Sequence, residues 1–238
     1  MKVTTYRRVS PKVSRPYRLV FLTDIHNKPF EALVAQVAGE KPDAILISGD
    51  IVDRHRKTWK RALPFLRACA ETAPTFFSYG NHEIKFPKLS AEDIAGTGVV
   101  LLDNNYVPFG DLLIGGHTPY TRFDWLADFE KEEGYKILLN HHPEYFYKEP
   151  DGRKVFTGGP GLEAHEDLDL ILAGHAHGGQ WRFFDRGVLA PGQGLMARYV
   201  RGEYGSMVVS TGCSNTAAPL IPRFFNPREI VEITIVPE

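Results

Sequence analysis

Short runs of apolar residues alternate along this chain with segments in which apolar residues recur every three or four positions. The runs have the length of buried strands and are rich in branched and aromatic side chains, which is typical of β-structure. We expect strands at 18–23, 44–48, 75–79, 99–103, 112–115, 136–140, 170–173, 204–211 and 229–236. Helical spacing predicts helices at 30–39, 59–69 and 124–133. Pro64 marks either a kink in the second helix or its first turn.

The composition is that of a globular α/β protein. The 238 residues include 43% hydrophobic and 24% charged residues, which argues against disorder. Segments 144–165 and 185–204 are rich in Gly, Pro and charge, so we expect long surface loops there. Two cysteines, Cys69 and Cys213, stand far apart in no metal-ligand spacing, which excludes a disulfide framework and a zinc ribbon. No repeat or linker divides the chain, and we expect one layered domain over residues 1–238.

The overall charge of the chain does not favour binding to nucleic acid or to a membrane. The net charge is −1 and the isoelectric point is about 6.8, so sequence-specific nucleic acid binding is not expected. No apolar run is long enough to span a membrane or to form a leader, which predicts a cytoplasmic protein. Residues 1–18 carry basic side chains and no acid. We interpret them as a solvated edge hairpin. The alternative is a basic arm that makes peripheral contact with the anionic lipid of a membrane or binds another polyanionic partner. The sequence does not indicate the oligomeric state.

Metal-ligating residues gather where the expected strands end. Five strand ends lead into Asp24-Ile25-His26, Gly49-Asp50-Ile51-Val52-Asp53-Arg54, Gly80-Asn81-His82-Glu83, Asn140-His141-His142 and Gly174-His175-Ala176-His177-Gly178-Gly179-Gln180. The carboxyl ends of strands share one edge of an α/β sheet, and ligands bind there. Carboxylates, an amide and imidazoles without sulfur suit Mn²⁺, Fe²⁺/³⁺, Zn²⁺ or Co²⁺. The donors are too many for one tetrahedral site and fit two metals that share a carboxylate, about 3.5–4 Å apart.

The ordered motifs DxH, GDxxD, GNH, H and GHxH resemble the signature of the calcineurin-like metallophosphoesterases. They span residues 24–179, and the ending GHAHGGQ is similar to a bacterial phosphodiesterase subgroup in which GHTHGGQ is usual. The segments 199–204 and 219–230 are similar to the closing region of that subgroup. The resemblance implies a four-layer α-β-β-α sandwich, in which two mixed sheets are flanked by helices and the dimetal site lies at the strand ends.

The same resemblance implies a role for each motif residue. The first metal would be held by Asp24, His26 and His177, the second by Asn81, His141 and His175, and Asp50 would bridge both. His82 would bind no metal and would act as a general acid or as a charge stabiliser. Asp53 would orient His82. Arg54 either grips phosphate, as in the phosphoprotein phosphatase branch, or is a solvated loop charge.

Two positions depart from the pattern, and several residues are open to another interpretation. Glu83 stands where Asp is usual and Ala176 where Thr is usual, and neither supplies a ligand. His55 and His165 are expected to be exposed, and His117 to be structural or to support the site. His142 is expected to face away from its neighbour His141, because adjacent strand residues point to opposite faces. Trp181 and Phe183–Phe184 are interpreted as sheet core, with a substrate wall as the alternative.

The expected function is hydrolysis of phosphoric esters, most of all phosphodiesters, with two Mn, Fe or Zn ions as cofactors. A hydroxide held between the metals would attack phosphorus in line. Small phosphoesters are the expected substrates. The alternatives are a pyrophosphatase of UDP-diacylglucosamine type at a membrane surface, a phosphoprotein or monoester phosphatase, and a non-catalytic scaffold. The scaffold is disfavoured because all the ligands and His82 are present.

Overall fold

Two mixed six-stranded sheets form the centre of this computed structural model. The structure describes residues 1–54, 59–85, 89–144, 146–148, 154–156, 167–184, 186–215 and 222–238. In spatial order, the first sheet contains β1 (Lys2–Val9), β17 (Glu229–Val236), β2 (Tyr17–Leu22), β3 (Ala44–Ser48), β4 (Thr75–Ser78) and β5 (Val100–Leu102). The second contains β15 (Gly202–Tyr204), β16 (Met207–Val209), β11 (Leu170–Ala173), β8 (Tyr135–Asn140), β7 (Leu112–His117) and β6 (Asn105–Phe109).

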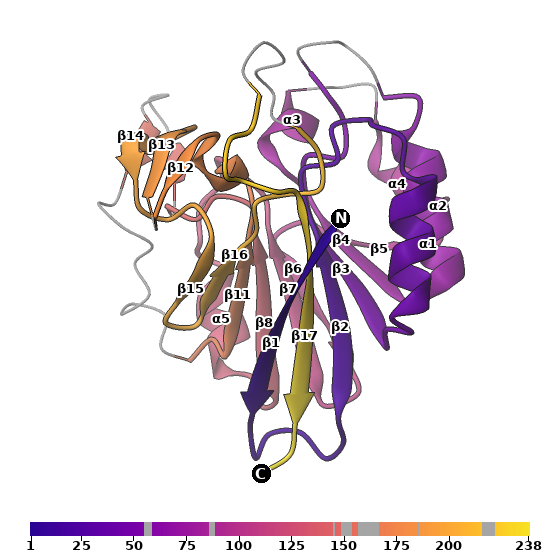
Figure 1. The fold of residues 1–238 in the computed structure, drawn as a ribbon. Coiled ribbons are helices and arrows are strands. Elements are labelled where there is room, and N and C mark those ends of the chain that lie inside the picture. The colour runs from indigo at the N-terminus through magenta and orange to yellow at the C-terminus, as the bar shows by residue number, and fades with distance from the viewer. Residues whose placement is uncertain are drawn as a thin grey trace.

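Helices cover the outer faces of both sheets (Figure 1). On the first sheet lie α1 (Glu31–Gly39), α2 (Ala62–Thr72) and α4 (Ala91–Ala95), and on the second lies α5 (Leu126–Lys131). The short α3 (Asn81–Ile84) stands at the strand ends. Pro64 lies in the first turn of α2, where its missing N–H leaves no helical hydrogen bond unmade. Among the described residues, no helix is long and apolar enough to cross a membrane.

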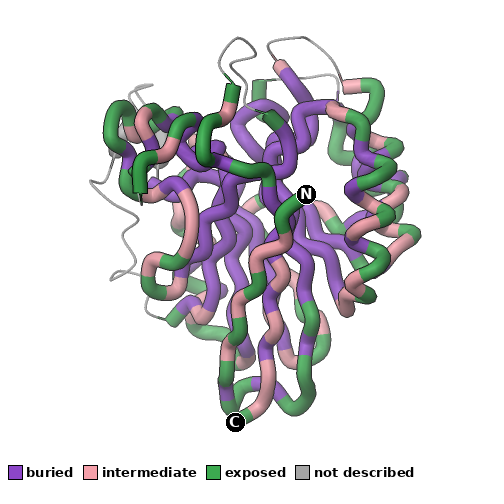
Figure 2. Tube along the Cα trace, viewed as in Figure 1, coloured by how far each residue is buried: buried purple, intermediate pink, exposed green. Residues whose placement is uncertain are grey.

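Strand β2 shows how the sequence builds these layers. Leu19 and Phe21 point into the core between the two sheets, while Val20 and Leu22 point into the core under the helices. Alternate residues of a strand face opposite sides, so a run that is apolar throughout is buried on both faces. Figure 2 shows the central strands buried over most of their length. The four-layer sandwich is therefore confirmed.

The parallel strands β2, β3 and β4 of the first sheet, and β7, β8, β11 and β16 of the second, end at the same side of the molecule. That side is the top of Figure 1, and it also carries α3. The topology therefore brings motifs that are far apart in the sequence to one edge, as expected.

The N-terminal segment is an edge strand, although it does not form a hairpin with its neighbour. The C-terminal strand β17 lies between β1 and β2, parallel to β1 and antiparallel to β2. The local excess of basic residues is offset in the folded chain, because four of them form ion pairs with distant acids. These pairs are Arg8–Glu203, Lys12–Asp169, Arg15–Asp43 and Arg18–Glu232.

The prediction of a loop over residues 185–204 is wrong for most of that segment. It contains β13 (Arg186–Ala190) and β14 (Gly194–Ala197), which form a small antiparallel sheet with β12 (Arg182–Phe183). The expected strand 204–211 is shorter, because a turn at 205–206 separates β15 from β16. Of segment 144–165, much lies outside the described residues, and β9 (Phe146–Lys148) pairs there with β10 (Lys154–Phe156). Gly and Pro made these segments resemble loops, whereas short hairpins also need such residues at their turns.

Candidate metal centre

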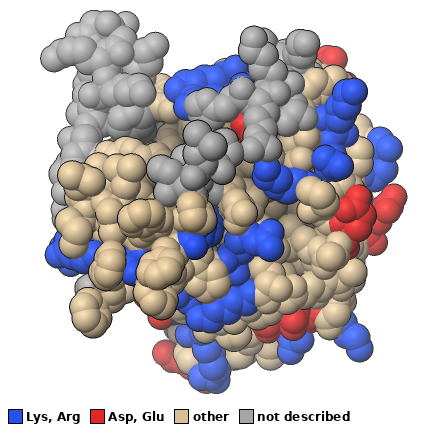
Figure 3. Space-filling model, turned by 45° about the horizontal axis from the view of Figure 1, so that its top comes forward, with Lys and Arg blue, Asp and Glu red and all other residues tan. Residues whose placement is uncertain are grey.

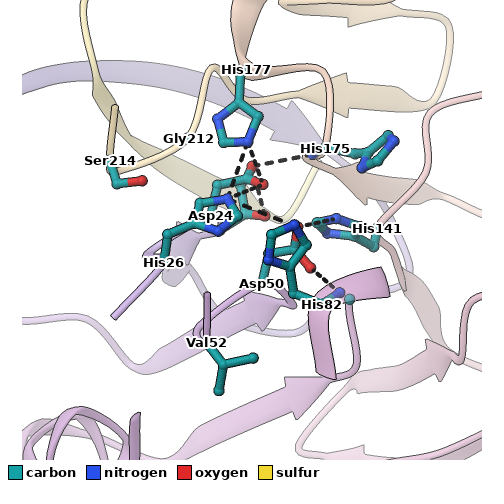
Figure 4. A network of polar contacts seen from close by, with 12 residues as sticks. Asp24, His26, Asp50, Val52, His82, His141, His175, His177, Gly212 and Ser214 are labelled. Atoms are coloured by element: carbon teal, nitrogen blue, oxygen red, sulfur yellow. Dashed lines mark hydrogen bonds and ion pairs between the residues drawn. The ribbon is translucent and has the colours of Figure 1, made fainter. Parts of the chain in front are cut away.

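The strand ends bring six of the expected ligands together with His82 (Figure 4). Within each of three groups, donor atoms lie within 4.8 Å of one another, and the groups are Asp24, His26 and His177; His26, Asp50 and His82; and Asp50, His141 and His175. His26 and Asp50 each belong to two groups, so the groups adjoin. Asn81 begins α3, and its buried Oδ1 has no hydrogen-bond partner among the described residues.

Asp50 lies at the middle of the cluster. Its Oδ1 accepts a hydrogen bond from the His82 backbone N–H at 2.8 Å, which fixes the carboxylate. Its Oδ2 faces the Nε2 atoms of His141, His82 and His26 at 3.2, 3.8 and 3.9 Å. Burial alone would raise the pKa of Asp50, but the imidazoles of His141 and His82 lower it well below its usual value. The carboxylate is therefore held ionised between the two outer groups of donors.

His141 is oriented by its second ring nitrogen. The His141 Nδ1–H donates to the carbonyl oxygen of Ser48 at 2.8 Å. A neutral ring with its proton on Nδ1 presents the Nε2 lone pair toward Asp50, which is how a second hydrogen bond orients a metal-binding histidine. Burial would lower the pKa of His141, whereas Asp50 raises it to about 10. The site thus stabilises a positive charge next to this nitrogen, and a metal ion would meet the same need.

The group of Asp24, His26 and His177 is also buried and also suited to bind a cation. The Nε2 atoms of His26 and His177 lie 3.1 Å apart and face Asp24 Oδ1 at 3.7 and 3.5 Å. That buried oxygen has no hydrogen-bond partner among the described residues. Burial lowers the pKa of His177 to about 3, so the ring is neutral at neutral pH. A neutral imidazole and an unsatisfied carboxylate oxygen form a donor set that fits a divalent cation.

Unfavourable backbone conformations coincide with the cluster. Asp24, His26, Asp50, His175 and His177 all have φ between 48° and 62°, in the left-handed region. Residues other than glycine rarely adopt this region, and such strain concentrates at functional sites. The chain therefore bends sharply after each strand and turns these side chains inward.

The glycines of the motifs make this close packing feasible. A Cβ on Gly49, whose φ is +70°, would lie 2.2 Å from Gly80 N, and one on Gly80 would lie 2.3 Å from Asp50 Oδ1. The glycines of the last motif also allow close packing. A Cβ on Gly174 would lie 2.1 Å from Thr23 Oγ1, and one on Gly179 would lie 2.3 Å from Gly187 Cα.

Glu83 connects two of the motif loops. Its carboxylate accepts hydrogen bonds from the backbone N–H groups of Asp50, Gly80 and Val52 at 2.8, 2.8 and 3.0 Å. The side chain is buried, and burial together with Asp50 raises its pKa. The sequence drew attention to Glu83 only as a departure from the usual Asp, and the structure shows that it holds the loop of Asp50 against α3.

His82 is held by the backbone of the neighbouring loop. The Arg54 N–H points at His82 Nδ1 at 3.3 Å, so Nδ1 accepts and the neutral ring carries its proton on Nε2. Burial lowers the pKa of His82 to about 4. Asp53, which is buried, precedes Arg54 in the chain, and its role in orienting this ring stays a prediction.

The structure corrects two expectations and supports a third. The rings of His142 and His175 lie 4.2 Å apart, so His142 does not face away from the cluster. Strand alternation fails there because β8 ends at Asn140. His117 is buried and stacked on Phe123 with ring centroids 3.6 Å apart, which is the structural role expected. Trp181, Phe183 and Phe184 are exposed, so their interpretation as sheet core is wrong. His55 and His165 lie outside the described residues.

Arg223 is a residue near the cluster that sequence reasoning missed. Its Nη2 donates to the carbonyl oxygens of Thr211 and Ser214 at 2.6 and 2.5 Å and lies 3.4 Å from His177 Nδ1. Burial lowers the pKa of its guanidinium to about 10. The only signal in the sequence was its place in the closing segment 219–230. The folded chain brings this segment beside the last motif, because Asn226 Nδ2 donates to His177 O at 2.7 Å.

Comparison with known proteins gives the family context of this geometry. The sequence profile of a family described as calcineurin-like phosphoesterase matches residues 17–179. An uncharacterized metallophosphoesterase of Helicobacter pylori is 28% identical over 245 residues, which cover 95% of this chain and 62% of that protein. The phosphodiesterase YaeI of Escherichia coli is 27% identical over 195 residues, which cover 70% of this chain and 63% of that protein. The chain thus spans less than two thirds of the length of these relatives.

Solved structures show more distant similarity. The protein TT1561 of Thermus thermophilus aligns with a TM-score of 0.48 and 15% identity, over 66% of this chain and 81% of that one. The purple acid phosphatase PPD1 of yellow lupin aligns with a TM-score of 0.41 and 16% identity, over 71% of this chain and 39% of that one.

Proposed function

This chain belongs to the calcineurin-like phosphoesterase family, and from that premise we propose that it is a metal-dependent phosphohydrolase that prefers phosphodiesters. The observation that carries the proposal is the position of Asp50, whose Oδ2 lies between the Asp24, His26, His177 group and the His141, His175 group. One carboxylate between two adjoining donor sets is the arrangement that a pair of metal ions needs, since its charge reduces their mutual repulsion.

We assign the ligands as the sequence motifs suggest. Asp24, His26 and His177 would hold the first metal, His141, His175 and Asn81 would hold the second, and Asp50 would contact both. The donor set of imidazole and oxygen, without sulfur, favours Mn, Fe or Zn over Ca or Mg. Two such ions, when bound, supply an activated water as nucleophile and offset charge on the phosphoryl oxygens.

The protein's own groups position the substrate and stabilise the charge that develops on it. His82 has its proton on Nε2, and this N–H faces the centre beside Asp50. A neutral imidazole with a low pKa is a hydrogen-bond donor rather than a strong acid. We therefore assign His82 to stabilisation of a phosphoryl or leaving-group oxygen, which is the second of the two roles that its motif allows.

The preference for diesters is supported by similarity to a protein named phosphodiesterase. A monoester dianion carries a second charge that needs a further cation, whereas a diester does not. Arg54 next to His82 is the motif residue that would meet that need, so it is the observation that favours the monoester alternative.

A comparison of two aryl substrates tests the proposal. The purified protein with added Mn²⁺ should hydrolyse bis-p-nitrophenyl phosphate at least as well as p-nitrophenyl phosphate, measured as kcat/KM. Elemental analysis of the same preparation should find about two metal ions per chain. A monoester preference of about tenfold or more would contradict the diesterase assignment and favour a phosphatase. A metal-loaded protein that hydrolyses neither substrate would contradict this proposal.

A further inference from the structure

The small sheet of β12, β13 and β14 exposes its large apolar side chains and buries small ones. Its inner face packs through small residues, and the buried cluster there consists of Ala176, Ala190, Ala197 and Val200. Its outer residues are large, and among them Phe184 is 97% exposed and Leu195 is 76% exposed. An ordinary surface sheet buries its large apolar residues and exposes polar ones. In this sheet the arrangement is reversed, since the large apolar residues are the exposed ones.

The closing segment extends the same surface. Trp181 Nε1 donates to Pro222 O at 2.9 Å, and Trp181 pairs with Phe224 in an isolated bridge. Phe225 beside it is 74% exposed. We call the resulting surface the apolar platform, and it comprises Trp181, Phe183, Phe184, Leu189, Leu195, Met196, Phe224 and Phe225. Eight of the twelve exposed large hydrophobic residues in the described part of the chain thus belong to it, which makes this a patch rather than scattered exposure.

Three exposed residues of the platform have an unfavourable backbone conformation. Phe184, Met196 and Phe225 have φ of 54°, 53° and 51°, in the left-handed region that bulky residues rarely adopt. At an exposed turn, Gly or Asn would adopt this conformation with less strain. Phe184 and Phe225 lie at such bends of the chain, whereas Met196 lies within β14. Bulky apolar residues in this conformation at three exposed positions point to a function that requires them.

The charges around the platform are basic. Apart from Arg223, which is held at the metal centre, segments 180–200 and 222–228 contain Arg182, Arg186, Arg198 and Arg228, and the single acid in them, Asp185, lies outside the described residues. Figure 3 shows this part of the surface, at the left, as mostly uncharged, with basic side chains at its margin. A partner of the platform must therefore be apolar in the middle and anionic around it.

We propose that the apolar platform docks on an anionic lipid bilayer. Aromatic and aliphatic side chains on two neighbouring segments can enter the boundary between headgroups and acyl chains, where Trp and Phe are favoured. Arginines at the margin can contact anionic headgroups, and each basic residue near such a surface adds attraction that salt screens. This inference goes beyond hydrolysis, since it concerns where the protein works.

The platform adjoins the candidate metal centre. Trp181 follows His177 closely in the chain, Asn226 Nδ2 donates to His177 O at 2.7 Å, and Arg223 Nη2 lies 3.4 Å from His177 Nδ1. A bilayer that contacts the platform therefore lies next to the side of the centre formed by His177. Docking places the catalytic edge of the sandwich at the membrane surface.

Vesicle sedimentation tests the proposal. The wild-type protein should sediment with vesicles of phosphatidylcholine and phosphatidylglycerol at low salt, and less with phosphatidylcholine alone or at high salt. The variant Phe184→Asn/Phe225→Asn removes the two most exposed rings and keeps a residue that tolerates positive φ. We expect its partition coefficient to fall at least about tenfold. The matched control Val9→Ser/Val100→Ser changes exposed apolar residues elsewhere and should bind as the wild type does.

Binding needs no turnover, so this result is independent of the proposed hydrolysis. Both variants should keep the wild-type melting temperature and hydrolyse soluble bis-p-nitrophenyl phosphate at the wild-type rate. The proposal is overturned if the wild type does not sediment with anionic vesicles, or if the platform variant sediments equally well. It is also overturned if the protein forms dimers that Phe184→Asn/Phe225→Asn dissociates while no vesicle binding occurs, because the platform would then be an interface between two copies.

Discussion

Asp50 Oδ2 lies 3.2 Å from His141 Nε2, and this contact connects the two sheets at the candidate metal centre. Asp50 follows β3 of the first sheet, and His141 follows β8 of the second. The His141 Nδ1–H also donates to Ser48 O at the end of β3. The His141 ring therefore contacts two residues of the first sheet and its following loop, Ser48 and Asp50. The alignment of the two halves of the centre therefore depends on the packing of the sheets.

The first prediction concerns Asp50→Asn. The neutral amide cannot offset the charge of two cations, and its NH₂ group would face imidazole nitrogens. Bound metal should fall well below that of the wild type, and kcat/KM should fall by more than the roughly 10–100-fold typical of a residue behind the ligands. Elemental analysis and turnover measure the effect. Asp124→Asn, on the exposed surface, is the control. An Asp50→Asn protein that retains its metals and most of its turnover would remove Asp50 from the bridging role.

The second prediction concerns Glu83→Gln. Glu83 accepts three backbone hydrogen bonds, and a glutamine must turn its NH₂ toward at least one of these buried N–H donors. We expect a loss of about 2 kcal/mol in the free energy of unfolding. That corresponds to a fall in Tm of roughly 4–8 °C for a chain of this size. Thermal unfolding of the metal-free protein measures it. Glu92→Gln on α4 should leave Tm unchanged, and an equally stable Glu83→Gln protein would show that Glu83 does not hold the loops.

The third prediction concerns His82→Ala. If the Nε2–H stabilises charge on phosphoryl oxygens, the variant should keep its metals and lose about 10²–10³-fold in kcat. The loss should be similar for an aryl and an alkyl ester, because the phosphoryl charge is common to both. The decisive measurement is the mutant-to-wild-type ratio for the two substrates at matched metal content. A far larger loss on the alkyl ester would show that His82 donates a proton to the leaving oxygen. A drop in bound metal would assign it as a ligand.

The fourth prediction concerns the two thiols. Cys69 and Cys213 are buried, and burial raises the pKa of both, that of Cys213 to about 12. A raised pKa lowers the thiolate fraction at every pH below it, and the thiolate is the reactive form. The folded protein should therefore react slowly with a disulfide reagent at mildly alkaline pH, and both thiols should react at once in guanidinium. Rapid reaction of the folded protein would show that one of these cysteines is accessible.

Most of the fold could be predicted from the apolar runs and from the helical spacing of apolar residues along the chain. Strands β2, β3, β4, β8 and β11 each contain a continuous apolar run, so burial of these runs on both faces followed from local pattern alone. The motifs could be placed at one edge because strand ends of an α/β sheet converge. Pro64 likewise lay in the first turn of its helix, for a local steric reason.

Contacts between distant segments decided the rest. The insertion of β17 between β1 and β2 pairs the two ends of the chain, and no local pattern indicates which strands are neighbours. The ion pairs of the basic N-terminal segment form with acids up to the far end of the sequence. The role of Glu83 likewise required the loop of Asp50 to fold against α3. These features arise from packing, which brings together residues that the sequence separates.

The apolar platform shows the same division most clearly. Trp181, Phe183 and Phe184 are apolar in the sequence, and apolar residues next to a buried motif are most simply explained as core. In the folded chain they face outward, because Gly179 and Gly187 bring the backbones too close for large side chains to fit beneath the small sheet. Which face of a strand is buried depends on what packs against it, and that is a property of the folded chain.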